Sequence, residues 1–142
     1  MIDLGKHNLL GVMVNAIDYE ASVDRIVWAA QDKAPCAVAA LAVHGLMNGA
    51  LDKTHRYRLN DMDLVVPDGQ PVRWALDRLY STNLADRVYG PSLMLKTCQR
   101  AAALGLPIYL FGGDASLIER LSSVVRRQFS DLQIAGSEPS KF

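Results

Sequence analysis

Cysteines and long apolar runs are scarce in this chain of 142 residues. Its two cysteines, Cys36 and Cys98, form no C-x-x-C pair, which is typical of buried thiols in a reducing cytosol and gives a disulfide no support. The longest apolar run covers residues 36–43, whereas a membrane-spanning helix needs roughly 20 apolar residues. No charged N-terminal segment leads into an apolar stretch, so the sequence predicts no signal peptide.

Metal-ligand and nucleophile motifs are also missing. The three histidines are scattered without a spacing that binds metal, and the chain has neither a G-x-S-x-G elbow nor a Walker loop. Asp61-Met62-Asp63 has the form of a metal-binding D-x-D, but it precedes a predicted strand and so falls at the wrong edge of the sheet. We therefore predict neither a metal site nor a cofactor.

Charge of one sign is not in excess. Fifteen Lys and Arg residues balance fifteen Asp and Glu residues, which argues against a nucleic-acid partner. Half of the residues are apolar and 21% are charged, so the chain has the composition of a globular protein with a core. Its length suits a single domain over residues 1–142.

Short apolar segments alternate with helical ones along the chain. This pattern predicts an α/β fold that is Rossmann-like, with a mostly parallel sheet and helices on both faces. Strands are expected at residues 9–17, 36–42, 63–67, 107–111 and 132–136. Helices are expected at residues 18–33, 43–52, 55–62, 71–80, 91–104 and 115–129. A parallel sheet needs cover on both faces, yet no helix follows the last strand, so we expect the chain to stop in mid-pattern.

Ligands of such sheets bind beyond the carboxyl ends of the strands, which directs attention to four loops. Asp68, with Gln70 nearby, follows the strand at 63–67 and can act as a general base on a hydroxyl, although a helix N-cap or Asp-Gly turn is the simpler interpretation. Gly112 and Gly113 can cradle a phosphate with bare backbone N–H groups, or form a plain turn. Arg87 can pair with a diphosphate or lie in water. His44 lies near the mouth of the crevice or simply starts a helix.

Several of these segments together resemble one family. Leu64 to Gly69 (LVVPDG), Asp86 to Pro91 (DRVYGP) and Tyr109 to Gly113 (YLFGG) occur in the order of the WecG/TagA/CpsF glycosyltransferases. The opening residues 11–18 (GVMVNAID) are also similar to the start of that family.

The resemblance implies an inverting glycosyltransferase. Such an enzyme transfers N-acetylmannosamine, its uronate or a related hexose from a UDP-sugar to a polyprenyl-diphosphate-linked acceptor, in exopolysaccharide or cell wall synthesis. It works in the cytoplasm as a peripheral protein at the inner face of the bacterial plasma membrane. It binds that membrane through a C-terminal region, which we expect this chain to lack. On this view Asp68 is the catalytic base, Arg87 faces the diphosphate, Gly112 and Gly113 line the nucleotide side, and His44 and Gln70 contact substrate. A homo-oligomer is left open.

The chain departs from the family pattern at the end of the second strand and directly after the R-V-x-G motif. Ala40-Leu41-Ala42 stands where many members carry T-x-N near the donor, and Ser92 replaces a usual aspartate. A subfamily that uses His44 instead is one interpretation. A catalytically degenerate homologue that binds nucleotide-sugars, or a different nucleotide-sugar enzyme, are the alternatives.

Overall fold

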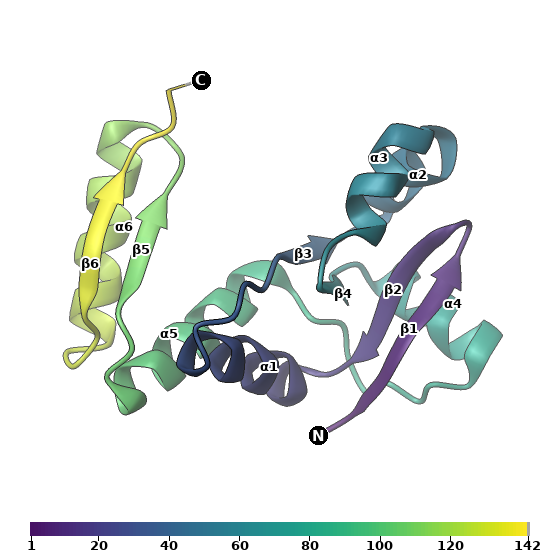
Figure 1. Cartoon of the computed structure of the whole chain (residues 1–142), viewed down its shortest axis with the longest axis horizontal. Coiled ribbons are helices and arrows are strands. Elements are labelled where there is room, and N and C mark those ends of the chain that lie inside the picture. Colours follow the sequence, from purple (N-terminus) through teal and green to yellow (C-terminus); the bar gives the residue numbers. More distant parts are fainter. Residues whose placement is uncertain (142) are drawn as a thin grey trace. The chain divides into compact units, whose positions relative to one another are not determined.

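The structure, a computed structural model, describes residues 1–141 and alternates strands with helices (Figure 1). The chain divides into two compact units, Met1–Leu93 and a second that starts at Met94. The first unit holds β1 (Asp3–Leu9), β2 (Val12–Ile17), α1 (Tyr19–Gln31), β3 (Val38–Leu41), α2 (Val43–Leu51), α3 (Lys53–Asn60), β4 (Leu64–Pro67) and α4 (Gln70–Tyr80). Helix α5 (Gly90–Leu104) begins in the first unit, and β5 (Ile108–Phe111), α6 (Ala115–Gln128) and β6 (Ile134–Glu138) complete the second. The predicted α/β class is confirmed.

The strands of the described residues form three two-stranded sheets. Strands β3 and β4 are parallel, as are β5 and β6, whereas β1 and β2 are antiparallel. A mostly parallel sheet is therefore not confirmed, although two of the three strand pairs are parallel. The Rossmann-like arrangement with helices on both faces, like the single domain over residues 1–142, stays a prediction.

The prediction of one strand over residues 9–17 is wrong, because the chain reverses at Leu10 and Gly11. Both residues have positive φ, 55° and 90°, which is the backbone of a tight turn between antiparallel strands. The side-chain oxygen of Asn8 accepts a hydrogen bond from the Gly11 N–H at 2.7 Å and fixes the turn. The apolar run on both sides of the turn masks it, so β1 was missed.

Two asparagine side chains bond the free edge of β2 to the elements that follow. The Asn60 amide, at the end of α3, donates to the Gly11 carbonyl at 3.0 Å and accepts from the Met13 N–H at 2.7 Å. Asn15 is 1% exposed, and its Oδ1 accepts from the Val65 N–H of β4 at 2.8 Å. The Asn15 amide thus takes the place of a strand-to-strand hydrogen bond between the hairpin and β4, and the Asn60 amide joins the hairpin to the end of α3.

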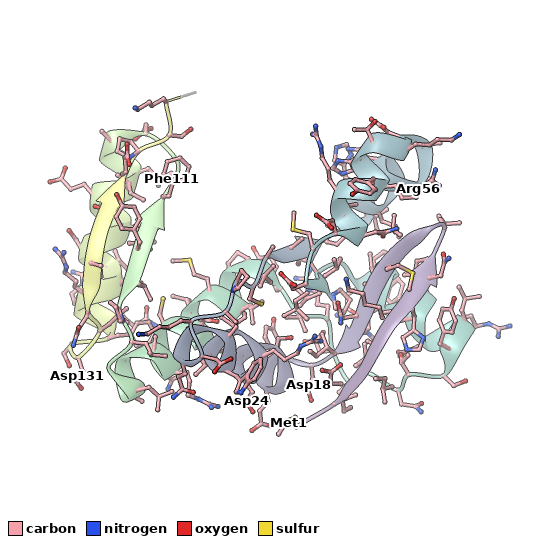
Figure 2. The ribbon with its side chains drawn as sticks, viewed as in Figure 1. Met1, Asp18, Asp24, Arg56, Phe111 and Asp131 are labelled. Atoms are coloured by element: carbon pink, nitrogen blue, oxygen red, sulfur yellow. The ribbon has the colours of Figure 1, made fainter. Side chains whose placement is uncertain are left out.

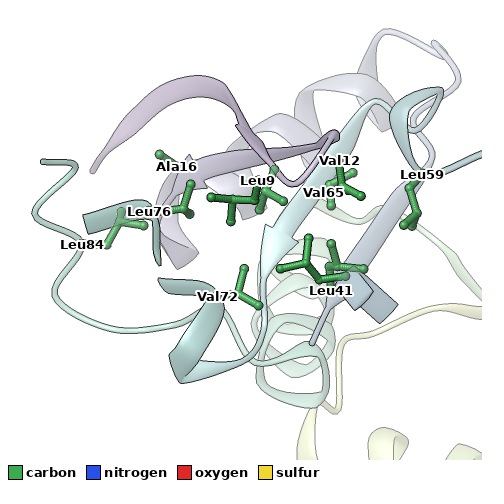
Figure 3. Close-up of a cluster of buried hydrophobic side chains, with 11 residues drawn as sticks. Leu9, Val12, Ala16, Leu41, Leu59, Val65, Val72, Leu76 and Leu84 are labelled. Atoms are coloured by element: carbon green, nitrogen blue, oxygen red, sulfur yellow. The ribbon is translucent and has the colours of Figure 1, made fainter. Parts of the chain in front are cut away.

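Apolar side chains from both sheets pack into one core in the first unit (Figure 3). Every residue of β4 is buried, as expected of a central strand. The core consists of Leu9, Val12, Val14, Ala16, Leu41, Leu46, Leu59, Val65, Val72, Leu76 and Leu84.

Asp18 caps α1, as predicted, by accepting from the Ala21 N–H at 2.9 Å, and it is labelled in Figure 2.

The second unit has a smaller core of its own, formed by Cys98, Ala101, Val125 and Leu132. Cys98 is buried and Cys36 is half-buried. Both are free cysteines, and burial raises the pKa of each thiol.

Within residues 1–141, no helix combines the length and the apolar character that crossing a bilayer requires.

Replacement of Asn15 by alanine should destabilise the protein, because the buried Val65 N–H would lose its acceptor. We expect a loss of about 1–3 kcal/mol in the free energy of unfolding, measured by urea titration. The control is Gln31→Ala, at the exposed end of α1, which should change this free energy by less than about 0.5 kcal/mol. Equal effects of the two substitutions would contradict the assigned role of the Asn15 amide.

Candidate functional site

The carboxyl ends of β3 and β4 bring two loops side by side. Leu41 pairs with Pro67 in the parallel register, so the residues that follow them, Ala42 and Asp68, are neighbours. The Asp68 N–H continues the ladder by donating to the Leu41 carbonyl at 3.1 Å. Helices α2 and α4 begin directly after these loops. The predicted residues His44, Asp68 and Gln70 therefore lie at one edge of the first unit.

The Asp68 carboxylate is half-buried at this edge and faces Gly90. Its Oδ2 lies 3.6 Å from the point where a Cβ on Gly90 would stand, and Ala40 borders the same glycine. The N-cap of α4 is Gly69, and no side chain caps that helix. The interpretation of Asp68 as a helix N-cap is therefore wrong. Within residues 1–141 its carboxylate accepts no hydrogen bond, so its oxygens are available to a ligand.

The segment that carries Arg87 runs past the end of β4. The Val88 N–H donates to the Pro67 carbonyl at 2.9 Å, and the Tyr89 N–H donates to the Tyr19 hydroxyl of α1 at 2.8 Å. The Arg87 guanidinium carbon lies 4.8 Å from the centre of the Tyr89 ring, within the range of a cation–π contact. This geometry holds a half-buried cation beside an exposed aromatic ring, at the edge that also carries Asp68.

A hydrogen-bonded group of side chains joins this segment to α4. Gln70 donates through Nε2 to Asp86 Oδ1 at 2.6 Å and accepts through Oε1 from Arg73 Nε at 2.8 Å. The same Asp86 oxygen accepts from the Arg87 N–H at 2.7 Å. The Arg87 backbone N–H and then the Gln70 amide hold the pKa of the Asp86 carboxyl below its usual value.

His44 lies in the first turn of α2 and is exposed. Its Nε2 is 3.2 Å from Nδ2 of Asn48, one turn further along the helix. The N-cap of α2 is Ala42, and no side chain accepts a hydrogen bond from the first turn. An asparagine at this position, as in the family's T-x-N, is among the best N-cap residues. The departure at Ala42 thus leaves the start of α2 without a side-chain cap.

The double glycine belongs to the second unit and forms a turn after β5. Gly112 and Gly113 have φ angles of 123° and 69°, which only glycine adopts readily, so the chain bends here after β5. The Gly112 N–H donates to the Glu138 carbonyl at 3.1 Å, and the Gly113 carbonyl accepts from the Ser140 N–H at 2.9 Å. Its phosphate-binding role stays a prediction.

Asp114 caps the helix that follows the double glycine. Its carboxylate accepts from the Leu117 N–H and from the Ser116 hydroxyl, both at 2.8 Å, and these bonds lower its pKa. A charged oxygen thus occupies the start of α6, where a phosphate would otherwise find free N–H groups.

The aspartates of the D-x-D sequence lie away from the candidate site. Asp61 is the C-cap of α3, and Asp63 precedes β4 and accepts from the Ala37 N–H at 2.7 Å. Both stand at the amino end of that strand, as the sequence indicated. Over residues 1–141, no three His, Cys, Asp or Glu side chains come close enough to share a metal ion.

Sequence reasoning missed the residues that support the Arg87 segment. Asp86 and Tyr89 lie in the segment DRVYGP but were given no role of their own, and Tyr19 and Arg73 belong to none of the motifs named above. Gln70 and Arg73 are three residues apart in a helix, and this spacing predicts that their side chains are in contact. The bond from Gln70 to Asp86 crosses 16 residues and carries no such signal.

Comparison with protein families gives one match that covers nearly the whole chain. The model described as "Glycosyl transferase WecG/TagA/CpsF family" matches residues 7–142. The match includes both strand ends of the candidate site, the Arg87 segment and the double glycine.

The Asp86 carboxyl should titrate below its usual pKa of 3.8, since two N–H donors stabilise its charged form. Because the folded pKa is the lower one, the stabilisation from Asp86 is complete above 3.8 and is lost as pH falls through the folded value. Carboxyl NMR shifts followed against pH test this, and Gln70→Ala should move the midpoint upward. An unchanged midpoint in that variant would show that the Gln70 bond does not form in solution.

Proposed function

We propose that this chain, which belongs to the WecG/TagA/CpsF family of glycosyltransferases, transfers a hexose from a UDP-sugar to a polyprenyl-diphosphate-linked acceptor. The sugar is N-acetylmannosamine, its uronate or a related hexose, and the product enters exopolysaccharide or another cell-surface polysaccharide. The reaction takes place at the cytoplasmic face of the bacterial plasma membrane, where an acceptor of this kind is anchored.

The observation that carries the proposal is the Asp68 carboxylate, half-buried at a strand end and free of hydrogen bonds within the described residues. A rigid strand holds it, because its own N–H belongs to the β3–β4 ladder. A carboxylate in this position can take the proton of an acceptor hydroxyl. A helix cap could not, because its oxygens would be occupied by backbone N–H groups.

In the proposed step the acceptor oxygen forms a bond to the anomeric carbon of the donor sugar. The bond from that carbon to the diphosphate oxygen breaks on the opposite face, so the anomeric configuration inverts, and the hydroxyl proton passes to Asp68. UDP leaves with the bonding electron pair, and the Arg87 guanidinium pairs with the diphosphate before and during the step. We place His44 beside the donor sugar.

A degenerate homologue that binds the nucleotide-sugar without turnover is the second candidate. Ala42 favours it, because the family's asparagine would both cap α2 and present an amide at the donor edge, and alanine does neither. Calorimetric titration with UDP, followed by a transfer assay, separates the two candidates. Binding with turnover supports the enzyme, and binding without turnover supports the homologue.

Asp68→Asn should lower the turnover number by about 10²–10⁴-fold, since it keeps the size of the side chain but removes its basicity. Binding of the UDP-sugar should change little. The matched control is Asp61→Asn, the same substitution at the C-cap of α3, which should retain full activity. Near-normal transfer by the Asp68 variant would show that another group takes the proton.

Arg87→Ala should raise the KM for the UDP-sugar by roughly 10- to 100-fold, because a charge-assisted hydrogen bond to the diphosphate is lost. Arg87→Lys should restore only part of the affinity, since lysine lacks the planar fork that pairs with phosphate oxygens. Arg58→Ala, in the last turn of α3, serves as the control. Steady-state kinetics with varied donor would contradict the assignment if the KM stayed at the wild-type value.

A further inference from the structure

The orientation of the Gln70 carboxamide is set by partners that can bond in only one way. Arg73 Nε can only donate, so the atom 2.8 Å from it is the Gln70 oxygen. An ionised carboxylate can only accept, so the atom 2.6 Å from Asp86 Oδ1 is the Gln70 nitrogen. The sequence assigns Gln70 to substrate, yet both polar ends of its side chain are bonded to the protein.

Arg73, in turn, is held by two further acceptors. Its Nη1 donates to Asp77 Oδ2 at 2.7 Å and to the Leu84 carbonyl at 2.6 Å. The other oxygen of Asp77 accepts from the Thr82 hydroxyl at 2.6 Å and from the Leu84 N–H at 3.0 Å. Arg73 and Asp77 are only 18% and 27% exposed, so this ion pair is better shielded from water than a surface pair. The Gln70 side chain is therefore held by Arg73, which is itself fixed by its other hydrogen bonds.

Asp86 connects Gln70 to the backbone of the next residue, Arg87. Its Oδ1 accepts from both the Gln70 amide and the Arg87 N–H, so one oxygen joins α4 to the Arg87 backbone. Beyond Arg87, the Val88 N–H is held by Pro67 and the Tyr89 N–H by Tyr19. Arg87 is thus fixed on both sides, and its guanidinium is left to contact the Tyr89 ring and a ligand.

We propose that Gln70 and Asp86 are positioning residues that hold Arg87 in place for the donor diphosphate. They act through the Arg87 backbone and touch no substrate themselves. The proposal rests on the proposed donor function of Arg87. An Arg87 backbone that is already ordered loses less conformational entropy when a diphosphate binds the side chain, so breaking the Gln70–Asp86 bond should weaken nucleotide affinity and leave the chemical step unchanged.

The test exchanges the donor and the acceptor of the hydrogen bond between positions 70 and 86. Gln70→Glu should place a second carboxylate against Asp86 and break the bond, although a glutamate suits the first turn of α4. Asp86→Asn should be mild, because the amide oxygen can still accept from Arg87 and Gln70. In the double variant the side chain at position 86 turns so that its amide nitrogen donates to the new carboxylate at position 70 while its amide oxygen accepts from the Arg87 N–H, and Arg73 keeps its acceptor. The pair is then restored with its polarity reversed.

Binding of UDP, measured by calorimetry, should weaken roughly tenfold in Gln70→Glu and recover most of this loss in the double variant. In the transfer assay the KM for the donor should follow the same order while kcat changes little. Gln99→Glu, on the exposed side of α5, is the control for the added charge. A double variant that binds UDP no better than Gln70→Glu would overturn the proposal, because it would indicate direct contact between Gln70 and the ligand.

Hydrogen exchange at the Arg87 amide tests the positioning without any nucleotide. Exchange should be faster in Gln70→Glu than in the wild type and should return toward the wild-type rate in the double variant. Equal rates in all three proteins would overturn the positioning role. Failure of the wild-type chain to bind UDP would instead overturn the proposed donor function, and the exchange rates would still decide the role of Gln70 and Asp86.

Discussion

The hydrogen bond from the Val65 N–H to the Asn15 carboxamide is the contact on which the first unit depends. Strand β4 has a backbone partner, β3, on one edge only. On its other edge the Val65 N–H needs an acceptor, and Pro67 has no N–H to satisfy. A buried amide therefore completes β4 and at the same time joins it to the hairpin. Asp68 continues directly from β4 and is held by the bond from its own N–H to the Leu41 carbonyl of β3.

Side-chain amides replace strand pairing at more than one point in this unit. Asn60 bonds a carbonyl and an N–H of β2 much as a neighbouring strand would, and Gln70 joins α4 to a segment without regular structure. A carboxamide carries one donor group and one acceptor, as a peptide group does, and is therefore a natural substitute for it. Short strands become stable when such bonds satisfy their free edges.

The sequence predicts most elements of the fold because they depend on local signals. Apolar spacing, the Asp18 cap and Gly105, whose φ is +64°, indicate helices within a few residues of their observed ends. The hairpin was missed because Leu10, at positive φ, lies within an apolar run. The parallel direction of the β3–β4 and β5–β6 pairs was predicted, whereas their register was not, because register depends on contacts between distant segments. Of the site, sequence motifs point to Asp68 and Arg87, while the partners of Arg87 require coordinates.

The connection between α4 and α5 is anchored at every second residue. Thr82, Leu84, Asp86 and Val88 each bond to a helix or to the end of β4, while Asn83 and Ala85 between them are exposed. An extra residue anywhere in this connection would reverse the inward and outward positions beyond it and detach the remaining anchors. Most loops tolerate changes of length in evolution. This one should keep its length, with free variation at Ala85 and with asparagine, aspartate or glycine retained at position 83, where φ is 53°.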